Sequence, residues 1–103
     1  MADKNDRICF SKDEILEIYR EIEYIRGSLA EMGRYYSVPE NDDILDYNAE
    51  TTRFIDQEKI TRRLSTIRMN ITSKFDLSLG EDDMDDLERA CENIEYWKRP
   101  NSG

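Results

Sequence analysis

Between residues 15 and 36, apolar side chains recur at alternating spacings of three and four residues. No other feature of the chain constrains the fold more strongly. The repeat consists of Ile15, Ile18, Ile22, Ile25, Leu29, Met32 and Tyr36. This spacing places the side chains on one face of an α-helix for about three heptads. Ser11 and Glu14 match a capping box that predicts where the helix begins, and Pro39 predicts that it ends shortly before that residue. We therefore predict a helix over residues 12–36.

Two further apolar stripes predict two more helices. The helix expected from about residue 49 to 75 has a core stripe of Ile60, Leu64, Ile67, Ile71 and Phe75. Phe54 and Ile55 lie off this stripe, so we expect a bend near Asp56. The helix expected over residues 81–99 has a stripe of Met84, Leu87, Cys91 and Ile94, with Trp97 at its edge. A short additional helical turn near residues 42–47, with Ile44 and Leu45 pointing inward, is also compatible with the sequence.

The three stripes together predict the fold class. Each stripe is too narrow to stabilise an isolated helix, so the helices must bury one another. No strand pattern or internal repeat is present. We predict an all-α fold, an antiparallel bundle of three main helices that forms a single domain over residues 1–103, with flexible ends at about 1–8 and 100–103. A charge in the central layer, as in Ile22→Asp, is expected to unfold it.

The chain lacks the residues on which most enzyme active sites depend. It has no histidine, so the usual general base and the commonest metal ligand are missing. Its four glycines are scattered, which excludes a glycine-rich phosphate loop. Cys9 and Cys91 lack the spacing of a zinc site or a redox pair. We expect Cys91 in the core and Cys9 in a lid over it, and we predict neither enzyme activity nor a cofactor.

An acidic run opens the third predicted helix. Its carboxylates, which could hold a hard cation weakly, are Asp82, Asp83, Asp85 and Asp86. Negative charge in the first turn also stabilises a helix through its dipole. We favour that interpretation and predict no metal site.

The formal net charge of −9 limits the partners that the chain attracts. Nucleic-acid phosphates would be repelled, whereas a basic protein would be attracted. Residues 51–75 contain six basic and two acidic residues, and we expect these bases to form internal salt bridges. No signal-peptide pattern is present near residue 1, and no apolar stretch approaches the roughly 18 residues of a membrane span. We expect a cytosolic protein with reduced thiols.

One side of the first predicted helix has no role in the predicted core. The residues that point away from the stripe or lie at its flank are Asp13, Glu17, Glu21, Tyr24, Glu31 and Tyr35. Asp42, Asp43 and Asp46 extend this acidic surface into the following connection. Tyrosine is common at interface hot spots, and carboxylates steer a basic partner. We predict that these residues bind a partner; the alternative is a solvated face that carries two tyrosines.

These features predict a small, acidic, cytosolic binding protein that inhibits a basic protein partner. In type, the chain is similar to the bacterial immunity proteins, or antitoxins, that neutralise nuclease toxins, which are often short, acidic and without catalytic residues. A phage-encoded DNA mimic that blocks a nuclease is a close variant, since carboxylates can replace phosphates. A self-associating helical adaptor, homodimeric through the long helix, is the alternative, and a transcription-related adaptor that uses the basic helix is a third.

Overall fold

The computed structural model describes residues 4–100, and every regular element among them is helical. The elements are α1 (Lys12–Tyr35), the 3₁₀ turn η1 (Pro39–Asn41), α2 (Ile44–Gln57), α3 (Ile60–Thr72) and α4 (Asp86–Cys91). The predicted all-α class with three main helices is confirmed. Residues 9–74 form one compact unit, and the described residues 4–8 and 75–100 belong to a second. The ends at 1–3 and 101–103, which we expected to be flexible, lie outside the described residues.

The first predicted helix is confirmed almost to the residue. The Ser11 hydroxyl accepts a hydrogen bond from the Glu14 amide at 3.1 Å, and the Ser11 amide donates to the Glu14 carboxylate at 2.8 Å. This reciprocal capping box satisfies two amides that would otherwise lack a partner at the helix start. The local sequence therefore determines where α1 begins.

The single helix predicted over residues 49–75 is wrong, because the structure has two helices there. Asp43 caps α2 by accepting hydrogen bonds from the backbone amides of Leu45 and Asp46. The turn predicted near residues 42–47 is thus the beginning of α2. The helix is interrupted at Glu58 and Lys59, where Lys59 has a left-handed backbone with φ of 54°. A bend was expected, but it falls slightly after the predicted position.

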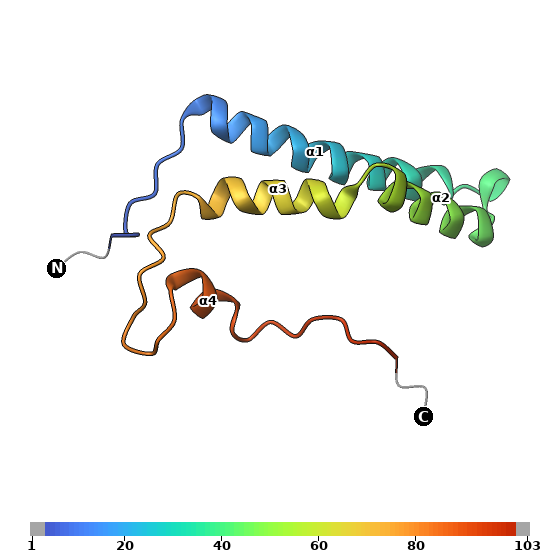
Figure 1. The fold of residues 1–103 in the computed structure, drawn as a ribbon. Helices are drawn as coiled ribbons and strands as arrows, with labels where there is room; N and C mark the ends of the chain where they lie inside the picture. Colours follow the sequence, from blue (N-terminus) through green and yellow to red (C-terminus); the bar gives the residue numbers. More distant parts are fainter. Residues whose placement is uncertain (1–3, 101–103) are drawn as a thin grey trace. The chain divides into compact units, whose positions relative to one another are not determined.

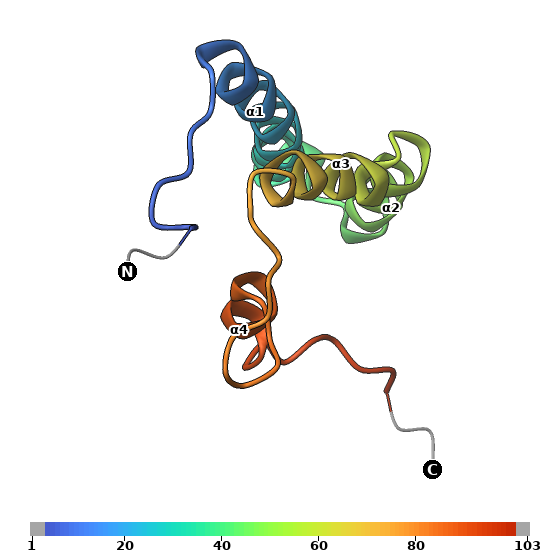
Figure 2. The same cartoon turned by 60° about the vertical axis from the view of Figure 1, so that its left-hand side comes forward.

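In the unit of residues 9–74, α2 and α3 run back along α1 and form an antiparallel hairpin (Figures 1 and 2). Its core consists of Ile18, Ile25, Ile60 and Ile67, which are 6–8% exposed. Phe10 and Phe54 pack against these four residues. On each helix the two buried isoleucines are seven residues apart, so a single line of each helix faces the other.

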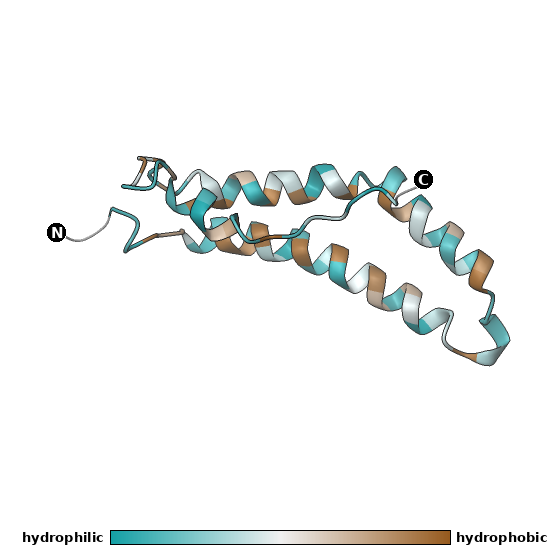
Figure 3. Cartoon of the chain, turned by 90° about the horizontal axis from the view of Figure 1, so that it is seen from below, coloured by the Kyte–Doolittle hydropathy of each residue, from teal (hydrophilic) through white to brown (hydrophobic). Residues whose placement is uncertain are grey.

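The rest of the predicted stripe is less buried than the sequence indicated. Ile15, Ile22, Leu29, Leu64 and Ile71 remain between 37% and 50% exposed. Hydrophobic residues accordingly recur along both α1 and α3 in Figure 3. One facing helix covers only part of a heptad stripe. In the predicted three-helix bundle, two helices would pack against each stripe. The expectation that Ile22→Asp unfolds the domain is therefore wrong in its premise, since Ile22 is outside the buried core.

The third predicted helix, over residues 81–99, is also wrong in extent. Only α4 forms, and it has six residues. Asp85 caps it and forms a capping box with Glu88. Beyond α4 the side chains of Ile94 and Trp97 are 49% and 80% exposed, so they lack the packing that sustains a helix. Cys91 is exposed as a free thiol, which corrects its predicted place in a core; Cys9 is exposed as well.

Carboxylates of the acidic run at residues 82–86 accept hydrogen bonds from a nearby arginine. Arg89 donates to Asp82 at 2.7 and 2.9 Å and to Asp86 at 2.8 Å. The hydrogen bonds from Arg89 lower the pKa of Asp82 to about 2. Asn5 bonds to Asp76 and Asp86, so part of the predicted flexible end at 1–8 is held by contacts. Across residues 4–100, no group of three potential metal-binding His, Cys, Asp or Glu side chains is found.

An ion pair across the open end of the hairpin should make its stability depend on pH. Lys74 lies 2.6 Å from the Glu14 carboxylate, and its hydrogen bond, together with that from the Ser11 amide, lowers the pKa of Glu14 from 4.5 to about 2. Because the folded-state pKa is depressed, the stabilisation is present above pH 4.5 and is lost as pH falls towards 2. We expect Glu14→Gln to unfold with a shallower acid dependence than the wild type in this window. Denaturant titrations at several pH values give the free energy of unfolding of both proteins. The same pH dependence for the variant and the wild type would contradict this expectation.

Candidate protein-binding surface

The structure separates the predicted binding residues into two groups. One group, on α1, consists of Asp13, Glu17, Glu21, Tyr24 and Glu31. The other, where the chain turns from α1 into α2, consists of Tyr35, Asp42, Asp43 and Asp46. The sequence alone predicts one continuous surface for the two groups.

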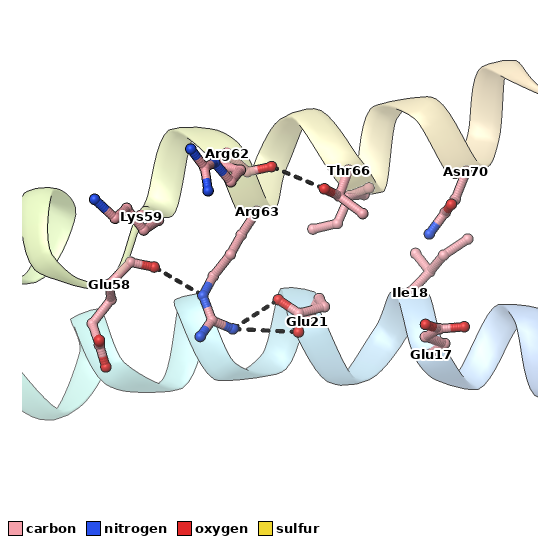
Figure 4. A pocket seen from close by; sticks show the side chains of 10 residues that line it. Glu17, Ile18, Glu21, Glu58, Lys59, Arg62, Arg63, Thr66 and Asn70 are labelled. Carbon is pink, nitrogen blue, oxygen red and sulfur yellow. Dashed lines mark hydrogen bonds and ion pairs between the residues drawn. The ribbon is translucent and has the colours of Figure 1, made fainter.

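Glu21 and Tyr24 belong to a network that joins α1 to the break between α2 and α3. Arg63 lies at its centre and donates to the Glu21 carboxylate at 3.0 and 3.3 Å and to the Glu58 carbonyl at 2.9 Å (Figure 4). The Tyr24 hydroxyl donates to the Glu58 carboxylate at 2.7 Å, which raises the pKa of Tyr24. The Arg63 guanidinium also lies 4.6 Å from the centroid of the Tyr24 ring. Both predicted binding residues thus have internal partners.

We expect Arg63→Ala to destabilise the hairpin by about 0.5–1.5 kcal/mol, because it removes the hydrogen bonds to the Glu21 carboxylate on α1 and to the Glu58 carbonyl at the break. The neighbouring Arg62 is exposed and serves as the matched control. Urea unfolding of Arg63→Ala and Arg62→Ala measures the difference. Equal midpoints for the two variants would show that the network does not stabilise the break.

A groove of about 400 Å³ runs beside this network between α1 and α3. Glu17 and Glu21 line it from α1, and Lys59, Arg62 and Arg63 line it from the other side (Figure 4). Glu58 lines it on the same side as these bases, so three acidic and three basic residues border the groove. This balance of charge does not favour a strongly charged ligand there.

The other predicted residues of α1 are exposed and have local roles. Asp13 lies in the first turn, where a carboxylate stabilises the helix dipole. Glu31 forms an ion pair with Arg34 one turn away. Glu17 is exposed at the edge of the groove. These residues supply surface charge, which acts on association more than on the lifetime of a complex.

Three tyrosines shape the closed end of the hairpin. Tyr36 and Tyr47 stack with ring centroids 5.4 Å apart, and Tyr35 meets Tyr36 edge-on at 4.8 Å. Tyr36 and Tyr47 are partly buried, whereas Tyr35 is 57% exposed. The stack ties the end of α1 to the first turn of α2, and it leaves Tyr35 on the outside.

The segment that leads from α1 into α2 also carries exposed aliphatic residues among carboxylates. Ile44 and Leu45, in the first turn of α2, are 63% and 75% exposed. Residues 35–50 contain five acidic residues and no basic residue. We call this region the tip surface, and its members are Tyr35, Val38, Glu40, Asp42, Asp43, Ile44, Leu45 and Asp46. It combines a local excess of negative charge with apolar side chains that the hairpin does not cover.

The prediction that Ile44 and Leu45 point inward is wrong, because both side chains are exposed. Tyr47 and Phe54 lie on the inward side of α2, where they contact rings of α1. At 100° per residue, Leu45 then points away from that side. A helix that begins before residue 47 and turns Tyr47 and Phe54 inward places Leu45 on its exposed side. This register was the signal in the sequence for the exposure of Leu45.

Comparison with known proteins identifies no relative. No family model matches the chain, and neither does any curated protein or solved structure. Among residues 4–100, no helix combines the length and the apolarity needed to cross a bilayer.

Proposed function

We propose that this protein is a small cytosolic inhibitor that binds a basic protein partner through the tip surface. The observation that carries the proposal is the exposure of Ile44 and Leu45 within a segment that has only acidic charges. Two aliphatic side chains this exposed, in a segment that also exposes Tyr35, have the composition of an interface centre. The carboxylates around them would attract a basic surface and repel an acidic one.

The kind of partner follows from this charge. Nuclease toxins have basic surfaces that bind phosphates, and an acidic inhibitor can occupy such a surface. We propose an immunity protein, or antitoxin, of a bacterial nuclease toxin as the biological role. A phage inhibitor that mimics DNA would use the same carboxylates, although Ile44, Leu45 and Tyr35 favour a protein interface over pure mimicry of phosphates.

The experiment is capture of the partner with the full chain from the native host, or co-expression with the product of the neighbouring gene. Leu45→Arg is compared with Met69→Arg, which changes a residue on α3 that is 59% exposed. We expect a basic protein to bind the wild type and Met69→Arg but not Leu45→Arg. Its enzymatic activity should fall when the wild-type inhibitor is added. Equal capture by both variants would exclude the tip surface as the binding site.

A further inference from the structure

The two long edges of the α1–α3 seam differ in character. The Arg63 network and the groove follow one edge. On the other edge, α1 carries Ile15, Ile22 and Leu29, which are 46%, 43% and 40% exposed. We call these three residues the apolar row. A helix wheel places Leu64 and Ile71 of α3 on the same edge, because they lie on the side of their helix away from Arg63.

The apolar row continues the buried core of the hairpin. Ile18 and Ile25, both in the core, alternate with its members along α1. The core itself has four buried residues, and among residues 4–100 no large side chain is less than 2% exposed. A helical hairpin with so small a core gains from burying a second apolar line against further helices.

The spacing of the row fits a second copy of the same chain. Ile22 is at its centre, and Ile15 and Leu29 lie seven residues to either side, about 10 Å along the helix axis. An interface with two-fold symmetry must pair residue i with j and also j with i. Two α1 helices that run antiparallel across Ile22 meet this condition, since each Ile15 then lies opposite a Leu29.

Two residues beside the row also come close to each other in this pairing. Tyr19, which is 59% exposed, precedes Ile22 by three residues, and Arg26 follows it by four. Both lie on the outer side of the row on a helix wheel. In the antiparallel pairing, Tyr19 of each copy comes beside Arg26 of the other. Glu23 holds the edge of the Arg26 guanidinium by an ion pair within α1, which leaves the face of the guanidinium to stack on a phenol ring. The two-fold arrangement thus forms two such pairs.

We infer that the apolar row of α1 is a homodimer interface, in which two hairpins pair antiparallel about Ile22. The α1 and α3 helices of the two copies then form a four-helix bundle. The tip surface follows the end of α1, beyond the row. The antiparallel pairing therefore leaves both tip surfaces uncovered at opposite ends of the dimer. Such a dimer would bind two partner molecules, although dimerisation itself does not depend on the proposed inhibitory function.

Light scattering of the purified full chain over a range of concentrations tests dimerisation without any partner. We expect a dimer for the wild type. Ile22→Asp should weaken it by at least about tenfold while the helix content is retained, because two half-exposed charges would face each other in the interface. Arg20→Asp, on the opposite side of α1, is the control and should remain dimeric. A wild-type monomer at every concentration would overturn the inference.

Cysteine cross-linking tests the antiparallel register in a background with Cys9→Ser and Cys91→Ser. Under mild oxidation, Ile22→Cys should form a disulfide with its own copy, whereas Arg20→Cys should not. Ile15→Cys and Leu29→Cys should cross-link efficiently only when the two variants are mixed. Efficient cross-linking of Ile15→Cys alone would show a parallel arrangement and overturn the proposed pairing.

Discussion

Replacing Ile25 with aspartate is expected to unfold the hairpin. Ile25 is 8% exposed in a core of only four residues, so the carboxylate would be buried without a partner. An uncompensated buried charge costs on the order of 3–5 kcal/mol. That is a large share of the total stability of a small domain. Far-UV circular dichroism should show loss of most of the helical signal.

Ile22→Asp is the matched control, since it makes the same substitution three residues earlier at a position that is 43% exposed. It should retain the helical signal, because its carboxylate can reach water. Ile25→Val, which removes one methylene, should cost only about 0.5–1.5 kcal/mol. If Ile25→Asp and Ile22→Asp unfold to the same extent, the single buried line along α1 is not what holds the hairpin together.

Truncating the apolar residues of the tip surface is expected to shorten the lifetime of the complex with the partner. Leu45→Ala and Tyr35→Ala should each speed dissociation, by an amount equivalent to about 1–3 kcal/mol if they are anchors. Neither should unfold the hairpin, because the side chains are 75% and 57% exposed. Surface plasmon resonance with the identified partner gives the two rate constants separately.

Neutralising acids of the tip surface should produce the opposite kinetic signature. Asp42→Asn and Asp46→Asn, combined, should slow association and reduce its dependence on salt, with little change in dissociation. Asp43 is left unchanged, because it caps α2. Glu17→Gln together with Asp13→Asn applies the same loss of charge to the predicted surface of α1. If only this second pair slows association, the partner is steered to the side of α1 and not to the tip.

Some features of the candidate site could be predicted from the sequence, because they depend on residues close together along the chain. Tyr35, Asp42 and Asp46 were recognised from their position after the apolar stripe and within an acidic connection. The roles of Glu21 and Tyr24 were not. Both look like free surface residues on a helix wheel, and only the approach of Arg63 from a different helix gives them internal partners.

The sequence by itself determined where α1 begins and which heptad runs through it, because capping and helical periodicity are local properties. The tertiary structure decided how much of each stripe is buried. Ile18 and Ile25 face a neighbouring helix, whereas Ile22 and Leu29 carry the same apolar signal and remain half exposed. The short α4 has the same origin, because Ile94 and Trp97 beyond it remain exposed. A short helix is stable where its apolar side chains pack against other residues, and those residues are distant in the sequence.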